Sequence, residues 1–348
     1  TPPFAPPPSG KREVMRKQMT RCISEAMSSD PRVVYIGEDV EHGGYYLVTS
    51  GLKDLHPGRV VDFPPDETTL VGAGMGFAQA GLVPIVEIPY AKYLDCGFDM
   101  FTEAACMTWL SGGREGMGMV VRLQGFDRGT FGGNFHTHNT LYCPPGVDVV
   151  CYSNGEDYAR GMRSAVDRAK QGRMSMLVDC TDLLNKRHVL GKDKAWLRPY
   201  PASRETLSLH DVRTYGDGEG GGRGGRGKVA VVTYGNGVVT SLQAREALPN
   251  PSDVDVVDCM LLSSVPDGLK EELAHYDRVV FADICKEGMN PLSGMLGELQ
   301  RPIERGGAGL AGKRWCAKAA ARGYNPLGSL VTFLNVDDVL EGIDEVLQ

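Results

Sequence analysis

An acidic run stands directly before a predicted helix. Residues 62–68 read DFPPDET, and residues 68–80 after them have a helical pattern. Asp66 is typical of a helix N-cap, and a carboxylate such as Glu67 is favoured at a helix start by the positive end of the helix dipole. Helix entry alone therefore explains the spacing. The functional alternative makes Glu67 a carboxylate that the helix start holds at the edge of a cleft.

Glycines interrupt the same predicted helix at residues 72–78, which read GAGMGFA. Each glycine in a helix interior costs about 1 kcal/mol relative to alanine, so the run needs a reason. Dinucleotide-binding loops place their glycines between a strand and a helix, which is not the case here. Gly72 and Gly76 share one helix face, so we expect a second backbone to approach closely there, as across a subunit interface.

Aromatic and histidine side chains supply two further candidates. Residues 87–93 read EIPYAKY and follow a predicted strand, where a ring such as Tyr93 either fills the core or rim or stacks on a planar cofactor. Residues 132–139 read GGNFHTHN. No third ligand stands at a suitable spacing, so we expect no metal site. Loop histidines are usually surface residues, but His136 could also transfer protons near neutral pH.

The composition excludes several classes of protein. The chain has 348 residues, a net charge of −7 and 42% hydrophobic residues. We expect no nucleic-acid partner, which would require a basic surface, and no membrane span, which would require about 18 consecutive apolar residues. The nine cysteines include no C-x-x-C pair, so neither a zinc site nor a disulfide framework is expected.

Short apolar runs alternate with amphipathic segments along most of the chain, which predicts an α/β fold with a mostly parallel sheet. Ligands of such sheets bind beyond the carboxyl ends of the strands. The predicted strands are residues 33–37, 85–88, 119–123, 147–152, 176–179, 229–234, 254–259 and 278–282. The predicted helices are residues 12–28, 68–80, 98–111, 156–171, 241–248 and 269–275.

A glycine-rich run at residues 216–227 cannot pack a core and suggests a break between two domains. We expect an extended proline-rich arm at 1–11, a first domain at 12–195, a linker with the glycine-rich insert at 196–227, and a smaller α/β domain at 228–348.

The order of several short blocks resembles the β subunit of the first component of 2-oxo acid dehydrogenase complexes, of the pyruvate and branched-chain types, in the transketolase-like superfamily. The matching blocks are GEDV at 37–40, DFP at 62–64 with Glu67, EIPYAKY at 87–93, SGG at 111–113, HT at 136–137 and PGV at 145–147. The block at 87–93 is more similar to the branched-chain member than to the pyruvate one.

This resemblance implies a pyrimidine-binding domain followed by a smaller C-terminal domain, in an α2β2 assembly that binds thiamine diphosphate. The α subunit would hold the diphosphate and magnesium. Glu67 would hydrogen-bond the aminopyrimidine ring nitrogen, Tyr93 would pack against that ring, and His136 would face the substrate and the incoming lipoyl group. The implied reaction is oxidative decarboxylation of a 2-oxo acid, branched-chain rather than pyruvate, with acyl transfer to a lipoyl acyltransferase core. The implied location is the mitochondrial matrix, with the plastid as an alternative.

The chain also departs from the family pattern. His138 replaces the family's glutamine, residues 258–266 lack its arginine, and residues 283–294 keep little of its glycine-rich block. These departures motivate an alternative, a catalytically silent paralogue that serves as a structural or assembly subunit. A third alternative is a detached pyrimidine-binding part of a transketolase-like synthase. Retention of Glu67, Tyr93 and His136 favours the enzyme.

Overall fold

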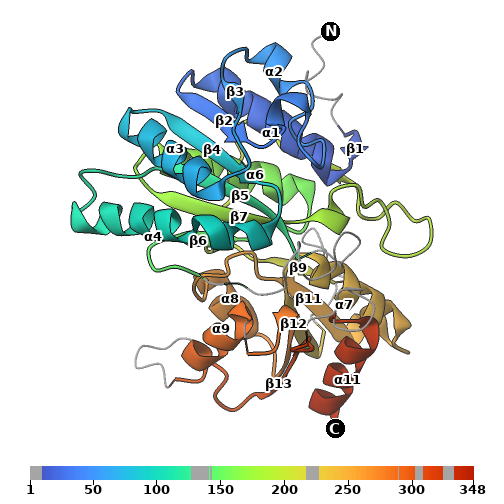
Figure 1. Ribbon diagram of the computed structural model, residues 1–348. Helices are drawn as coiled ribbons and strands as arrows, with labels where there is room; N and C mark the ends of the chain where they lie inside the picture. The colour runs from blue at the N-terminus through green and yellow to red at the C-terminus, as the bar shows by residue number, and fades with distance from the viewer. Residues whose placement is uncertain are drawn as a thin grey trace. The chain divides into compact units, whose positions relative to one another are not determined.

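The computed structural model describes residues 10–126, 141, 143–216, 227–288, 290–301, 309–323 and 333–348. The chain divides into two compact units (Figure 1). Unit 1 is drawn from Thr1–Gly125, Cys143–His188 and Lys194–Ser208. Unit 2 is drawn from Phe126–Tyr142, Val189–Asp193 and Leu209–Gln348.

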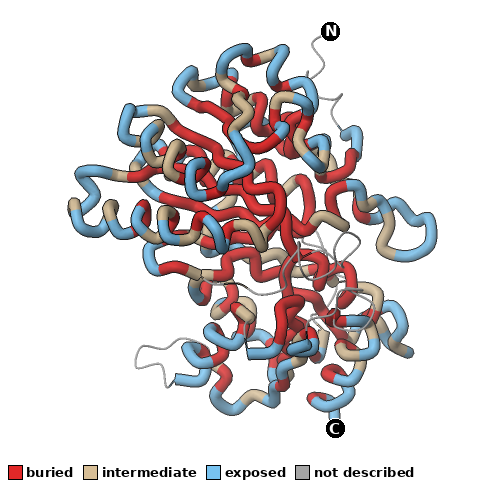
Figure 2. The backbone as a smooth tube through the Cα atoms, viewed as in Figure 1, coloured by how far each residue is buried: buried red, intermediate tan, exposed pale blue. Residues whose placement is uncertain are grey.

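Unit 1 contains a six-stranded sheet whose neighbouring strands all run parallel. Most of its strand residues are buried, as expected for a parallel sheet covered on both faces (Figure 2). In spatial order the strands are β3 (Val60–Asp62), β2 (Val33–Gly37), β4 (Val83–Ile88), β5 (Met119–Gly125), β7 (Met174–Cys180) and β6 (Asp148–Val150).

Two pairs of helices cover this sheet. α1 (Met15–Ser29) packs beside α6 (Gly155–Ala169), and α3 (Glu67–Gln79) packs beside α4 (Leu94–Leu110) on the other face (Figure 1). The short elements of unit 1 are η1 (Val40–His42), α2 (Leu52–Leu55), η2 (Ala91–Tyr93), η3 (Thr181–Leu183) and the antiparallel pair β1 (Arg12–Glu13) and β8 (Arg198–Pro199).

The glycines of α3 have different surroundings. A Cβ atom on Gly74 would lie 2.7 Å from Cγ2 of Val86, so this glycine lets α3 approach β4. A Cβ atom on Gly72 would lie 3.3 Å from Met100, whereas one on Gly76 would meet no described atom within 4 Å. Close packing of α3 on β4 therefore depends on Gly74 rather than on Gly72 or Gly76. The expected subunit contact at Gly72 and Gly76 stays a prediction.

Unit 2 contains a five-stranded sheet in which only β9 is antiparallel to its neighbour. The strands, in spatial order, are β13 (Arg314–Ala320), β12 (Arg278–Lys286), β10 (Val229–Thr233), β11 (Val254–Asp258) and β9 (Arg213–Tyr215). Its described helices are α7 (Asn236–Ala247), η4 (Pro251–Asp253), α8 (Asp267–Leu273), α9 (Pro291–Leu299) and α11 (Val336–Leu347).

The predicted fold class, a mostly parallel α/β domain followed by a second, smaller α/β domain, is confirmed. Every predicted strand and helix overlaps an observed element. The three-residue strand β3 was not predicted from the sequence, and neither were β9, β13, α9 and α11. The expected domain limits remain a prediction. Among the described residues, no helix is long and apolar enough to cross a membrane.

Candidate active site

Carboxylates gather at the carboxyl edge of the unit 1 sheet. Glu38 directly follows β2, Glu87 lies near the end of β4, and Asp179 lies near the end of β7. Glu67 opens α3, the helix that follows β3. All four are buried. Because the strands are parallel, their ends share one edge of the sheet, which is where ligands of α/β proteins bind.

Glu67 is held by the first turn of α3. The preceding Asp66 is the N-cap: its side chain accepts hydrogen bonds from the backbone nitrogen of Thr69 at 3.2 Å and from the Thr69 hydroxyl at 2.8 Å. A Cβ atom on Gly97 would lie only 2.7 Å from the carbonyl oxygen of Glu67, so α4 packs directly on this turn. Helix capping and a placed carboxylate are therefore compatible, and Glu67 is only 8% exposed.

Glu38 lies in the same electrostatic environment. Burial, followed by the charges of Glu67, Asp39 and Glu87, raises its pKa to about 7. Its Oε1 atom is buried and has no hydrogen-bond partner in the described structure. An unpaired buried oxygen is costly, so it marks a place where a ligand could supply the missing partner. Glu38 belongs to the GEDV block at 37–40 but was not predicted as a site residue. The sequence feature that could have identified Glu38 is an acidic residue directly after a buried strand.

Beneath these carboxylates, Arg122 connects β4, β5 and β7. Its Nη1 lies 2.6 Å from Oε2 of Glu87, and its Nε and Nη2 lie 3.0 and 2.5 Å from Oδ2 of Asp179. The Tyr35 hydroxyl is bonded to both Arg122 and Glu87, and Gln124 donates to Oε1 of Glu87 at 3.1 Å. Glu87 and Asp179 thus have internal partners, whereas Oε1 of Glu38 has none.

Tyrosine rings stand beside the carboxylates. Tyr90 makes edge-to-face contacts with Tyr93, Tyr45 and Tyr46, at centroid distances of 5.4, 5.5 and 6.3 Å. Burial, then the charges of Glu67 and Glu38, raises the pKa of Tyr93 above its usual value. Tyr93 is therefore within electrostatic range of both carboxylates. The arrangement offers flat apolar surfaces next to a group that can hold a proton.

The structure thus brings together two of the three predicted site residues, Glu67 and Tyr93. His136 lies outside the described residues, so its expected role stays a prediction. Within the described part of the chain, no group of three or more histidine, cysteine, aspartate or glutamate side chains is arranged to hold a metal ion.

Comparison with known proteins identifies the family of residues 13–185. Residues 13–185 match the model of the transketolase pyrimidine-binding domain, and this segment contains Glu38, Glu67 and Tyr93. The chain is 25% identical over 287 residues to the β subunit of acetoin:2,6-dichlorophenolindophenol oxidoreductase from Cupriavidus necator, which covers 76% of this chain and 77% of the relative. Residues 13–185 thus form a transketolase-like pyrimidine-binding domain, and the chain is similar to β subunits of acetoin, pyruvate and branched-chain 2-oxo acid oxidoreductases.

Two other similar proteins, named for different substrates, align with shorter parts of this chain. It is 32% identical over 166 residues to a mitochondrial pyruvate dehydrogenase β subunit of Arabidopsis thaliana, covering 45% of each protein. It is 32% identical over 147 residues to a mitochondrial 2-oxoisovalerate dehydrogenase β subunit of the same plant, covering 41% of each. These two alignments span less than half of either relative.

A solved structure shares the fold over almost the whole chain. It is described as a split-gene transketolase, an inactive β4 tetramer, and it superposes with a TM-score of 0.66 at 15% identity. The superposition covers 97% of this chain and 99% of that one. At this identity the likeness establishes the fold alone.

Proposed function

We propose that this chain is the β subunit of a thiamine-diphosphate-dependent 2-oxo acid dehydrogenase, which decarboxylates a 2-oxo acid and transfers the acyl group to lipoyl groups. One observation carries the proposal: the buried carboxylate of Glu67 is held at a helix start within electrostatic range of Glu38, whose pKa is raised to about 7 by burial and then by the charge of Glu67. That pair suits a heterocycle which must gain and lose a proton.

The residues present fit the aminopyrimidine part of the cofactor. Oε1 of Glu38 is buried without a hydrogen-bond partner in the described structure, and the carboxylate of Glu67 is buried at the start of α3. Tyr93 and the tyrosines around it provide rings for packing against a planar group. When bound, thiamine diphosphate supplies the nucleophilic carbon and the electron sink for decarboxylation.

In this proposal each residue of the chain has a separate task. Glu67 would share a proton between its carboxylate and a pyrimidine ring nitrogen. Glu38, with its raised pKa, keeps a proton beside it near neutral pH and limits repulsion between the two carboxylates. Tyr93 fixes the plane of the ring. His136, by its resemblance to the family histidine, donates a proton during acyl transfer.

The complete active site would require a partner. We infer an α subunit that holds the diphosphate and magnesium, in an α2β2 assembly that delivers acyl groups to a lipoyl acyltransferase core. The names of the similar proteins, which are β subunits, support a heteromeric assembly. We place the complex in the mitochondrial matrix, with a plastid as the alternative; several similar proteins are mitochondrial, and others are bacterial.

We favour a branched-chain 2-oxo acid over pyruvate because of residues 87–93. The similar proteins act on pyruvate, 2-oxoisovalerate and acetoin, so the substrate needs a direct test. The assembly should be purified from its native source and its partners identified. Carbon dioxide release that depends on thiamine diphosphate should then be measured with pyruvate and with 2-oxoisovalerate, and acetoin oxidation with dichlorophenolindophenol.

We expect an α-type partner and the fastest turnover with 2-oxoisovalerate. Fastest turnover with pyruvate or acetoin would contradict the substrate assignment and leave the enzyme class intact. An assembly with other partners and no turnover would contradict the enzyme itself. It would make the chain a silent paralogue with a structural role.

A further inference from the structure

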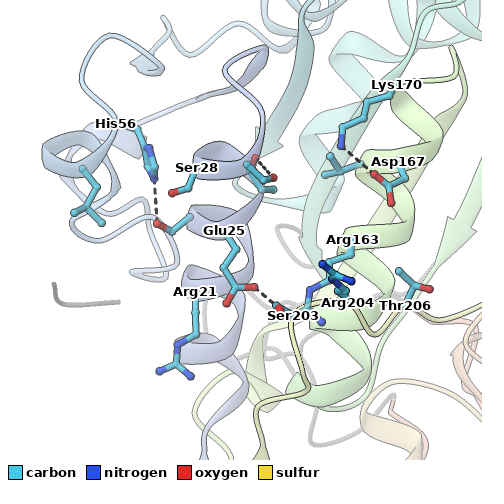
Figure 3. Close-up of a pocket in the computed structure, with 15 residues that line it drawn as sticks. Arg21, Glu25, Ser28, His56, Arg163, Asp167, Lys170, Ser203, Arg204 and Thr206 are labelled. Atoms are coloured by element: carbon cyan, nitrogen blue, oxygen red, sulfur yellow. Dashed lines mark hydrogen bonds and ion pairs between the residues drawn. The ribbon is translucent and has the colours of Figure 1, made fainter. Parts of the chain in front are cut away.

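A cavity of about 780 Å³ lies in unit 1, away from the candidate active site (Figure 3). Its walls come from the C-terminal half of α1, the end of α2, the C-terminal half of α6 and residues 203–206. Neither Glu38, Glu67 nor Tyr93 lines it. Volumes of this size are typical of sites for small organic ligands.

The charges around the cavity are unequal. Its lining contains four cationic side chains and two carboxylates, those of Glu25 and Asp167. The cations are Arg21, Arg163, Lys170 and Arg204 (Figure 3). Burial and the neighbouring Arg59 lower the pKa of His56, so this histidine adds no positive charge near neutral pH. Among the lining side chains the cations outnumber the carboxylates by two, and Arg204 forms no ion pair with a described residue, so its side of the cavity favours an anionic ligand.

One wall of the cavity is held rigidly. Arg163 donates to Oε2 of Glu25 at 3.1 Å and to the carbonyl oxygen of Ala202 at 2.7 Å, and the Tyr200 hydroxyl donates to the same Glu25 oxygen at 2.7 Å. The guanidinium groups of Arg21 and Arg163 also lie over the Tyr200 ring, 4.6 and 5.4 Å from its centroid. These contacts tie α1, α6 and the segment after β8 together without a ligand.

Arg21 and Arg204, two cations of the cavity, can form further hydrogen bonds. Arg21 is 7% exposed and bonds Glu13 through Nη2 at 2.9 Å, but its buried Nε and Nη1 have no partner in the described structure. Buried donors without an acceptor are costly, and an anion at this wall could supply the missing acceptor. Arg204 is exposed and forms no ion pair with any residue that the structure describes.

We propose that this cavity binds a small phosphorylated organic molecule. A guanidinium group presents paired donors that suit phosphoryl oxygens, and Arg204 is placed to provide them. Lys170 adds a point charge, and its only described partners are Asp167 at 3.0 Å and Asp30 at 3.9 Å. Ala26, Leu55 and Val166 provide apolar contacts for the organic part of the ligand. The site is independent of the proposed catalytic function.

The test uses the full chain, saturated with thiamine diphosphate and assembled with its α-type partner, titrated with ADP in a calorimeter. We expect ADP to bind and adenosine not to bind. Arg204→Gln should weaken ADP binding at least about tenfold, since a bond to a charged group contributes about that much. Arg322→Gln removes an exposed arginine whose nearest carboxylate is 3.7 Å away in unit 2, and it should bind ADP like the wild type.

A second variant tests whether ADP binds inside the cavity, by filling its space without changing its charge. Ser28 is exposed on α1 and lines the cavity, so Ser28→Trp should fill the space and abolish ADP binding without changing the thermal midpoint. The proposal is overturned if ADP does not bind the wild type, or if Arg204→Gln and Ser28→Trp both bind it normally. It is also overturned if adenosine binds as tightly as ADP, or if citrate at equal concentration displaces ADP.

Discussion

Two buried carboxylates, one at the carboxyl edge of each sheet, differ in their hydrogen-bond partners. In unit 2, Asp283 near the end of β12 accepts hydrogen bonds from the Tyr234 hydroxyl at 2.6 Å and from the backbone nitrogens of Cys285 and Leu292 at 2.8 and 3.0 Å. In unit 1, Glu38 keeps a buried oxygen without a partner, and Glu67 stands beside it. Asp283 and Glu38 are both buried, but Asp283 has partners for both of its oxygens, whereas Oε1 of Glu38 has none among the described residues.

This difference shows which property marks a candidate active site. Burial raises the pKa of both carboxyls, to about 6 for Asp283 and about 7 for Glu38. A raised pKa therefore does not distinguish them. The bonds of Asp283 fix the start of α9 and the end of β12, which is a structural task. The unmet bonding capacity of Glu38 is what a cofactor could use.

The largest expected effect on stability comes from the ion pairs beneath the unit 1 edge. Arg122→Met would leave Glu87 and Asp179 buried without their cation, so unfolding in urea should show a loss of about 3–5 kcal/mol. Arg32→Met is the matched control because Arg32 pairs with Asp30 on the surface, and its stability should match the wild type. An Arg122→Met protein as stable as the wild type would contradict the role given to this network.

Asp283→Asn tests whether the hydrogen bonds of Asp283 in unit 2 stabilise the fold without taking part in catalysis. Asparagine has one acceptor oxygen where aspartate has two, so at least one of three hydrogen bonds is lost. We expect urea unfolding to show a loss of about 1–3 kcal/mol, with turnover per folded assembly unchanged. A variant that folds fully but loses turnover would show that the unit 2 edge also takes part in catalysis.

Tyr93 tests the ring surface at the unit 1 edge. Tyr93→Leu should raise the dissociation constant of thiamine diphosphate in the assembly by about 3–10-fold, because an aromatic contact contributes about 0.5–1.5 kcal/mol. Tyr93→Phe keeps the ring and should bind the cofactor like the wild type. Equal binding by all three proteins would remove Tyr93 from the cofactor site.

A pH dependence of stability is expected from Glu38. Its folded pKa is raised from 4.5 to about 7, so folding favours the protonated form. The stability from this group is complete below pH 4.5 and is lost as the pH rises through about 7. Glu38→Gln stays neutral, so its stability relative to the wild type should increase between about pH 5 and pH 8. A difference that stays constant over this range would show that Glu38 is not the titrating group.

Local patterns in the sequence were sufficient to predict most of the helices and strands. Strands buried on both faces, such as β2 and β10, appear as nearly continuous apolar runs and were predicted directly. β3 has only three residues, and β13 mixes exposed and buried positions, so neither gives a clear signal. β9 falls within the segment that the sequence analysis assigned to a linker.

The candidate site was predictable only in part. The aspartate at position 66 marks a helix start, and the position of Glu67 follows from it. That Glu38 lies within electrostatic range of Glu67 depends on β2 lying between β3 and β4, and strand order cannot be read from a local pattern. The Arg122 network likewise joins residues from four strands.

Turnover of the Glu67→Gln variant, in an assembly purified with the α-type partner, tests the central claim most directly. Glutamine keeps the size and burial of the side chain but cannot hold the proton, so assembly and thermal midpoint should stay unchanged. Decarboxylation should fall by at least about 100-fold, the usual contribution of a positioned acid or base. Turnover equal to that of the wild type would contradict the assignment of Glu67 and, with it, the active site at the unit 1 edge.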